Sequence, residues 1–86
     1  MSRKLSWTKE AWQSYLYWQT EDRKTLKRIN KLIDATLRDP FDGIGKPEAL
    51  KANLSGFYSR RIDESNRLVY AVQEQMIVII SCRYHY

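Results

Sequence analysis

Residues 76–80 read Met-Ile-Val-Ile-Ile, a run that is apolar at every position. Successive side chains of a β-strand point to opposite faces, so a run without a polar residue predicts a strand that is buried on both faces. We therefore expect the strand that spans residues 76–86 to be the central strand of a sheet.

Three further strands are predicted from short runs of alternating and β-branched residues. They cover residues 4–7, 57–63 and 68–72. The last two are connected to each other and to residues 76–86 by the polar segments 63–66 and 73–75, which have the composition of hairpin connections. The C-terminal third of the chain is thus expected to form a meander of antiparallel strands.

Two helices are expected between the first strand and this meander. Thr8 can cap a helix over residues 9–19, and Thr20 is expected to cap a second over residues 21–38, which Pro40 ends. Helical spacing places five residues on one face of the first helix and leaves Tyr17 outside it: Ala11, Trp12, Tyr15, Leu16 and Trp18. Residues 47–50 are expected to form one helical turn, because Pro suits the first helical position. The predicted class is α+β, with two N-terminal helices packed on a mainly antiparallel sheet.

Length and composition limit the possible functions. The chain has 86 residues, enough for a single domain over residues 1–86, and a net charge of +5. A basic surface attracts nucleic acid, anionic membranes or acidic proteins alike. The single Cys82 and single His85 exclude an internal disulfide and make a zinc site of the usual kind improbable, so neither a metal nor a cofactor is expected. No long apolar run follows the N-terminus, which favours a cytoplasmic protein without a membrane segment.

Basic residues form two groups. The first lies on the polar face of the second predicted helix and consists of Arg23, Lys24, Lys27, Arg28, Lys31 and Arg38, opposed only by Asp34. Such a stripe can follow phosphates, although a solvated helix face has the same composition. The second group is interleaved with Tyr58, Tyr84 and Tyr86 around the strands and consists of Lys46, Lys51, Arg60, Arg61, Arg67 and Arg83. Arginines with aromatic residues suit single-stranded RNA, and aromatic residues in strands equally suit plain packing.

Three side chains could together cleave RNA. Glu48, in a loop rich in cations, is expected to stay ionised and could take the proton of a ribose 2′-hydroxyl, unless it only satisfies a helix end. His85 has a side chain that titrates near neutral pH and could act as general acid, unless it is an inert terminal residue. Arg67 could stabilise charge on the phosphate, or could form an ordinary ion pair with Asp63 or Glu64. A base, an acid and an anion stabiliser suit metal-free cleavage that uses the substrate's own 2′-hydroxyl.

Several motifs resemble those of the YoeB family of toxins. They are Trp12, Tyr15-Leu16-Tyr17-Trp18-Gln19, Gly45-Lys46-Pro47-Glu48, Leu54-Ser55-Gly56-Phe57, Ser59-Arg60-Arg61-Ile62, Arg67-Leu68-Val69-Tyr70-Ala71-Val72 and the ending Cys82-Arg83-Tyr84-His85-Tyr86. The resemblance covers nearly the whole chain, and the closing Arg-Tyr-His-Tyr is its most specific part. It implies a microbial-ribonuclease-like, RelE-like fold and a toxin of a type II toxin–antitoxin system. Such a toxin enters the ribosomal A site and cuts the mRNA there, and a YefM-type antitoxin holds it inactive.

The resemblance also assigns roles to individual residues. It implies that Glu48 is the general base, that Arg67 stabilises the phosphate, that His85 is the general acid and that Tyr86 positions the RNA. Further phosphate contacts are expected from Lys46, Lys51, Arg61 and Arg83, and ribosome contacts from Arg23, Lys24, Lys27, Arg28 and Lys31. A homodimer is also implied. Two alternatives stay open, namely a non-catalytic toxin of the ParE kind and a ribosome- or RNA-binding module, and the presence of the catalytic set favours the nuclease over both.

Overall fold

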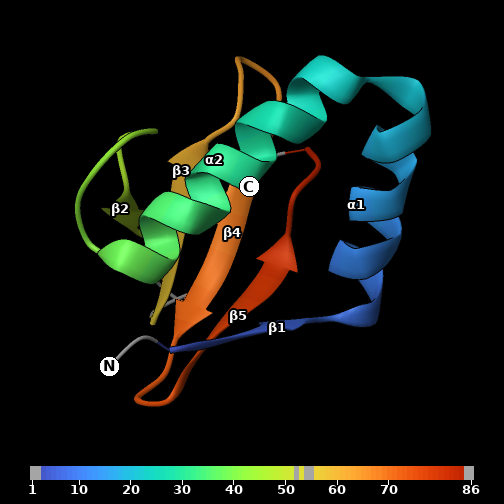
Figure 1. The fold of residues 1–86 in the computed structure, drawn as a ribbon. Coiled ribbons are helices and arrows are strands. Elements are labelled where there is room, and N and C mark those ends of the chain that lie inside the picture. Colours follow the sequence, from blue (N-terminus) through green and yellow to red (C-terminus); the bar gives the residue numbers. More distant parts are fainter. Residues whose placement is uncertain (1–2, 52, 54–55, 85–86) are drawn as a thin grey trace.

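Two helices cover one face of a five-stranded sheet in the computed structural model, which describes residues 3–51, 53 and 56–84 (Figure 1). In chain order the elements are β1 (Lys4–Trp7), α1 (Lys9–Glu21), α2 (Arg23–Arg38), β2 (Glu48–Ala49), β3 (Phe57–Arg61), β4 (Arg67–Val72) and β5 (Met76–Ser81). The predicted α+β class is confirmed.

The sheet has the strand order β1-β5-β4-β3-β2. Strand β1 runs parallel to β5, and the other neighbours are antiparallel, so the sheet is mainly antiparallel as predicted. Strand β5 is flanked by β1 and β4, and β4 is the central strand, so the predicted central place of the strand that begins at residue 76 is wrong. Ile77 and Ile79 are completely buried, whereas Met76, Val78 and Ile80 are only partly buried, so the expected full burial holds for one face of the strand only.

Two strands are shorter than predicted. Strand β3 ends at Arg61 because Asp63 forms a turn, in which its carboxylate accepts the backbone N–H groups of Ser65 and Asn66, each at 2.8 Å. Strand β5 ends at Ser81, beyond a register shift opposite Val69 and Tyr70. Residues 82–84, which follow Ser81, bend away from the strand direction. His85 and Tyr86 lie outside the described residues.

The two helices meet at Asp22, so the predicted cap at Thr20 is wrong. Helix α1 continues to Glu21, and the N–H of Asp22 closes it by donating to the carbonyl of Trp18 at 3.1 Å. The Asp22 carboxylate then caps α2 by accepting from the backbone N–H of Thr25 at 3.1 Å and from its hydroxyl at 2.8 Å. These hydrogen bonds, the backbone one foremost, lower the pKa of Asp22. An ionised cap satisfies free N–H groups better than a threonine would.

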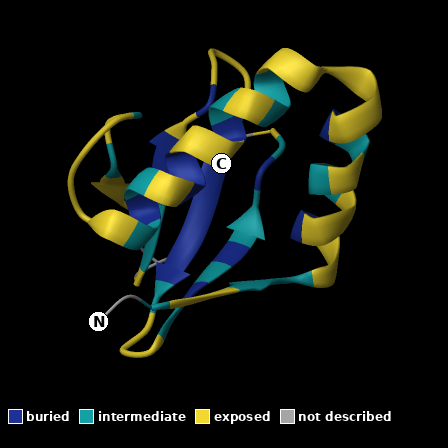
Figure 2. Cartoon of the chain, in the orientation of Figure 1, coloured by how far each residue is buried: buried dark blue, intermediate teal, exposed yellow. Residues whose placement is uncertain are grey.

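Helix α1 buries only part of the predicted face, because Ala11, Tyr15 and Trp18 lie in or against the core but Trp12 and Leu16 do not. Ala11 and Trp18 are buried as predicted, and the Trp18 indole N–H donates to the carbonyl of Cys82 at 2.9 Å. However, Trp12 and Leu16 are exposed, whereas Tyr17 is half-buried and packs against the core. The helix lies beside β5 at one side of the domain (Figure 2), so only a narrow stripe of its surface reaches the core. Helical periodicity finds the broad apolar stripe but not the side on which it is covered.

Residues 47–50 do not form the predicted helical turn. Glu48 and Ala49 instead form β2, in register with Ser59 and Tyr58 of β3. The N–H of Leu50 extends this pairing by donating to the carbonyl of Phe57 at 2.9 Å. Pairing with the free edge of β3 satisfies more backbone groups than an isolated helical turn could.

The most buried cation of the fold is Arg60 on β3, whose side chain is completely covered. Its guanidinium donates to the carbonyls of Asp39 at 2.6 Å, Asp42 at 3.0 Å and Ile44 at 2.8 Å, and to the Tyr70 hydroxyl at 3.2 Å. The Asp39 carbonyl lies at the C-terminal end of α2, where the helix dipole favours a cation. Arg60 is therefore a structural tether for the loop after α2, and its predicted place in an RNA-binding cluster is wrong.

Gly45 lets this loop close over Arg60. It has φ +84°, and a Cβ atom there would lie 2.7 Å from a methyl group of Leu32 and 3.0 Å from the Cβ of Arg60. Its carbonyl accepts the N–H of Arg61 at 2.7 Å. Only glycine fits a positive φ with no room for a side chain, so this residue and Arg60 together direct the chain from α2 into β2.

We expect Arg60→Met to lower the free energy of unfolding by on the order of 3 kcal/mol or more, because three carbonyls and a hydroxyl lose a buried donor. The matched control is Arg61→Met at the next, exposed position, which should change it by less than about 0.5 kcal/mol. Urea denaturation of both variants measures the difference. Equal midpoints for the two variants would show that the tether contributes nothing.

Candidate active site

Glu48 and Arg67 form an ion pair on the face of the sheet that points away from the helices. In β4 the core residues Leu68 and Tyr70 alternate with Arg67 and Val69, so Arg67 points to the opposite face. Its Nη1 donates to Oε1 of Glu48 at 3.1 Å, across the intervening strand β3. Within the described part of the chain this is the one ion pair. The predicted base and phosphate ligand are thus brought together, and the pairing of Arg67 with Asp63 or Glu64 is not observed.

The pair stays accessible to solvent. The side chain of Glu48 is 60% exposed and that of Arg67 is 26% exposed. An exposed ion pair contributes little to stability, since water competes for both charges. The contact can therefore be exchanged for another partner at a small cost in free energy.

A second arginine faces Arg67 across the strand pair. Arg61 on β3 and Arg67 on β4 are direct register partners, so both side chains leave the sheet on the same face. Like charges placed directly opposite each other repel. One carboxylate, that of Glu48, neutralises at most one of the two, so this end of the sheet favours an additional anion.

Two predicted lysines flank β2. Lys46 precedes it with a left-handed backbone of φ +51°, and Lys51 follows it. Both side chains are exposed. They add positive charge along the segment that carries Glu48.

Arg83 is placed differently from the other predicted phosphate ligands. Its guanidinium lies 3.6 Å from the ring centroid of Tyr17 on α1 and 4.8 Å from that of Tyr84. No hydrogen bond or ion pair joins its side chain to Glu48 or Arg67 among the described residues. The arrangement is a cation–π stack that joins the C-terminal segment, residues 82–84, to α1.

The C-terminal segment returns to Arg67. The carbonyl of Tyr84 accepts the backbone N–H of Arg67 at 2.8 Å, and the N–H of Tyr84 donates to the Asn66 side chain at 2.7 Å. Tyr84 has φ +64°, an uncommon conformation for a residue with a side chain. The last described residue is thus held beside the proposed phosphate ligand, immediately before His85.

A small pocket of about 100 Å³ opens beside the ion pair. It is lined by Glu48, Leu50, Ser59, Arg67 and Val69. Ser59 is buried, and its hydroxyl has no hydrogen-bond partner in the described structure. Sequence reasoning missed this serine. The available signal was strand alternation, which places Ser59 on the same face as the predicted phosphate ligand Arg61 two residues later.

A larger hollow of about 400 Å³ lies elsewhere, between the end of α2 and the loop after it. Its charged lining mixes both signs, with Lys31 and Arg38 beside Asp34, Asp39 and Asp42. A lining of alternating charge has no preference for a polyanion. The smaller pocket, where the base and the phosphate ligand meet, is therefore the candidate active site.

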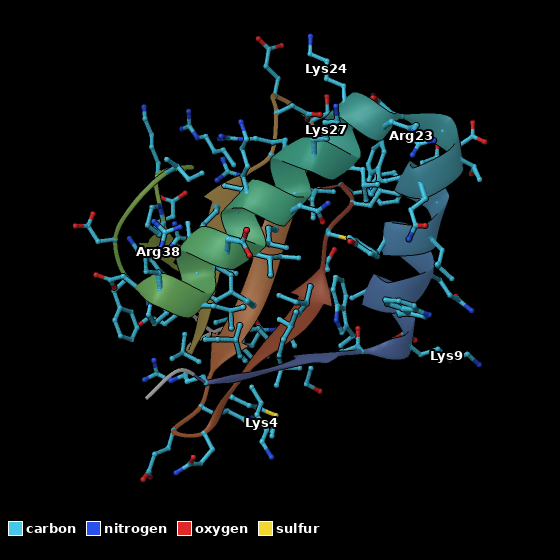
Figure 3. All side chains as sticks on the ribbon, viewed as in Figure 1. Lys4, Lys9, Arg23, Lys24, Lys27 and Arg38 are labelled. Atoms are coloured by element: carbon cyan, nitrogen blue, oxygen red, sulfur yellow. The ribbon has the colours of Figure 1, made fainter. Side chains whose placement is uncertain are left out.

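The basic stripe of α2 lies on the other side of the sheet. Arg23, Lys24, Lys27, Lys31 and Arg38 are exposed, and Figure 3 shows Arg23, Lys24 and Lys27 gathered at the N-terminal end of the helix. Arg28 is half-buried and donates to the carbonyl of Arg61 at 3.0 Å. One member of the predicted stripe thus supports β3, while the others remain free to contact a partner.

Two further features concern the Cys82 thiol and the character of the two helices. Burial raises the pKa of the Cys82 thiol to about 12, so this cysteine stays protonated and is a poor nucleophile. Neither described helix combines the length and apolar character that a membrane span requires.

Comparison with known proteins identifies the family. The model of the YoeB-like toxins of bacterial type II toxin–antitoxin systems matches residues 7–86. Toxin YoeB of Escherichia coli strain K12 is 59% identical over 83 residues, which are 96% of this chain and 99% of that protein.

Two solved structures share the fold throughout. The YoeB dimer from Staphylococcus aureus has a TM-score of 0.91 at 46% identity, covering 98% of both chains. The heterotetrameric YoeB–YefM toxin–antitoxin complex from the same species has a TM-score of 0.89 at 46% identity, again covering 98% of both chains. The resemblance seen in the sequence motifs and the RelE-like fold are confirmed, and the chain belongs to the family of YoeB-like toxins of bacterial type II toxin–antitoxin systems.

Proposed function

We propose that the protein is an endoribonuclease that cuts mRNA in the A site of the translating ribosome and thereby stops translation. The observation that carries this proposal is the Glu48–Arg67 pair, a carboxylate and a guanidinium in contact on an accessible face of the sheet. Arg61 in register with Arg67 adds the charge that a phosphodiester requires. A base beside an anion stabiliser is the arrangement that cleavage by a ribose 2′-hydroxyl needs.

The reaction divides into two proton transfers. Glu48 takes the proton of the 2′-hydroxyl while that oxygen bonds to the adjacent phosphorus. The bond from phosphorus to the 5′-oxygen of the next nucleotide breaks, and His85 donates a proton to that leaving oxygen. The products are a 2′,3′-cyclic phosphate upstream and a 5′-hydroxyl downstream. Tyr86 positions the RNA in this scheme.

Arg67 exchanges partners during the reaction. In the free protein its guanidinium binds Glu48, and with RNA bound it binds the phosphate, where negative charge accumulates in the transition state. The exchange also releases the Glu48 carboxylate to act as a base. Lys46, Lys51 and Arg61 bind the neighbouring phosphates, and Arg83 holds the C-terminal segment against α1 while it contributes charge.

The proposed binding partners are assigned from the cationic surfaces of the protein. The exposed cations of α2 contact the ribosomal RNA, so the proposed site of action is the cytoplasm. A YefM-type antitoxin inactivates the toxin by covering its cationic site, because the S. aureus relative forms a complex with YefM. We also propose that the free toxin forms a homodimer, since that relative is a dimer.

Variants Glu48→Ala, Arg67→Ala and His85→Ala should each lower the rate of mRNA cleavage on translating ribosomes by about 10²–10⁴-fold. Mapping of the mRNA ends measures this, and cleavage by the wild-type protein should leave a 5′-hydroxyl downstream. Ribosome binding should persist in all three variants. A wild-type protein that stalls translation without cutting mRNA would instead indicate a binding module, and an effect on gyrase would indicate a toxin of the ParE kind.

The partner exchange of Arg67 makes a second prediction. Glu48→Gln removes the negative charge that competes with the phosphate for Arg67. The affinity for a 2′-O-methyl oligoribonucleotide, which cannot be cleaved, should therefore rise about two- to fivefold, the equivalent of a partly exposed ion pair. Fluorescence anisotropy measures the dissociation constant. Arg67→Gln should weaken binding, and a weakened Glu48→Gln variant would contradict the exchange.

The α2 stripe makes a third prediction. Changing Lys24, Lys27 and Lys31 together to Gln should weaken ribosome binding and reduce the slope of log K against log salt by about 2–3, since three phosphate contacts are lost. Single-turnover cleavage at saturating ribosome should stay the same. The control is Lys4→Gln with Lys9→Gln, at the opposite end of the domain (Figure 3). Unchanged affinity of the triple variant at every salt concentration would make the stripe a solvated face.

A further inference from the structure

Ser59 is unusual because its buried hydroxyl group makes no hydrogen bond in the described part of the structure. It is 1% exposed, and its hydroxyl oxygen is the one buried side-chain nitrogen or oxygen without a hydrogen-bond partner in the described part of the chain. A buried polar group without a partner destabilises a protein, and alanine fits the same space without that cost. A hydroxyl kept at such a position indicates a use outside the resting structure.

The surroundings of Ser59 indicate that use. Ser59 on β3 is the direct register partner of Glu48 on β2, and on its other side it is the register partner of Val69 on β4. Cross-strand partners have Cβ atoms about 5 Å apart, within reach of a hydroxyl and a carboxylate. Both residues line the same pocket of about 100 Å³, which leaves the Glu48 side chain room to turn toward the serine.

We propose that Ser59 is a positioning residue that holds Glu48 when RNA takes Arg67 away from it. This inference rests on the proposed function. In the free protein the partner of Glu48 is Arg67 at 3.1 Å. Once that guanidinium binds the phosphate, the carboxylate loses this partner at the moment when it must be aimed at the 2′-hydroxyl. The Ser59 hydroxyl then donates a hydrogen bond to one carboxylate oxygen and leaves the other free to take the proton.

The resting structure explains why the serine has no partner there. Glu48 can accept from Arg67 or turn into the pocket toward Ser59, and the charge-assisted contact with the guanidinium is the stronger of the two. The hydroxyl therefore remains unpaired until substrate binds. A general base gains rate from orientation, because proton transfer requires hydrogen-bonding distance in the reactive geometry.

The test compares Ser59→Ala and Ser59→Thr with the wild-type protein in single-turnover cleavage of mRNA on programmed ribosomes. Ser59→Ala should cleave roughly 10- to 100-fold more slowly at saturating ribosome, the scale of a misplaced catalytic group, and its affinity for the ribosome should be unchanged. Its melting temperature should equal or exceed that of the wild type. Ser59→Thr keeps the hydroxyl, and the pocket offers room for its methyl group, so it should recover most of the rate.

The controls separate a positioning role from a structural one. Ser6→Ala makes the same substitution on β1, at the opposite edge of the sheet, and should leave the rate unchanged. A Ser59→Ala variant that cleaves as fast as the wild type would overturn the proposal, and so would a Ser59→Thr variant as slow as Ser59→Ala. A wild-type protein that does not cleave mRNA would overturn the proposed function together with this inference, whereas active wild-type protein with active Ser59→Ala overturns the inference alone.

Discussion

The buried guanidinium of Arg60 is the contact on which the rest of the site depends. A charged group inside a protein needs hydrogen bonds, and Arg60 donates three to backbone carbonyls at the end of α2 and in the loop after it, and one to the Tyr70 hydroxyl. Gly45 closes that loop, and the chain that leaves it pairs with β3 as strand β2. The place of Glu48 beside Arg67 thus depends on Arg60, a structural arginine on the opposite face of β3, the strand that lies between β2 and β4.

The two faces of the sheet have different roles. One face packs against α1 and α2 and supplies the hydrophobic core. The other carries Glu48, Arg67 and the pocket over Ser59, with charges that are only partly neutralised by one another. Each of these features lowers or fails to raise stability by itself: an exposed ion pair, two opposed arginines and an unpaired hydroxyl. Their concentration at one place is the physical reason for placing the proposed chemistry there.

Periodicity and residue type predicted the fold class and most elements, because the core of β5 and α2 follows simple apolar patterns. They failed where tertiary contacts outweigh local preference. The pairing of β2 with β3 overrode the helical turn expected at Pro47, and Asp22 replaced Thr20 as the cap. Arg60 could not be told from surface arginines, since burial depends on the loop that folds over it. Glu48 and Arg67 were proposed from residue type and family resemblance, but their contact across β3, and the part of Ser59, required the sheet register.

We propose that Glu48 and Arg67 promote RNA cleavage through the substrate's own 2′-hydroxyl. The most direct measurement is single-turnover cleavage on ribosomes programmed with an mRNA that carries one 2′-deoxynucleotide immediately upstream of the scissile phosphate, compared with the unmodified mRNA. We expect this single missing hydroxyl to abolish cleavage at that position and to leave ribosome binding of the protein unchanged. Cleavage of the deoxy-substituted mRNA at the normal rate would contradict it, because an external nucleophile would then have to attack the phosphorus.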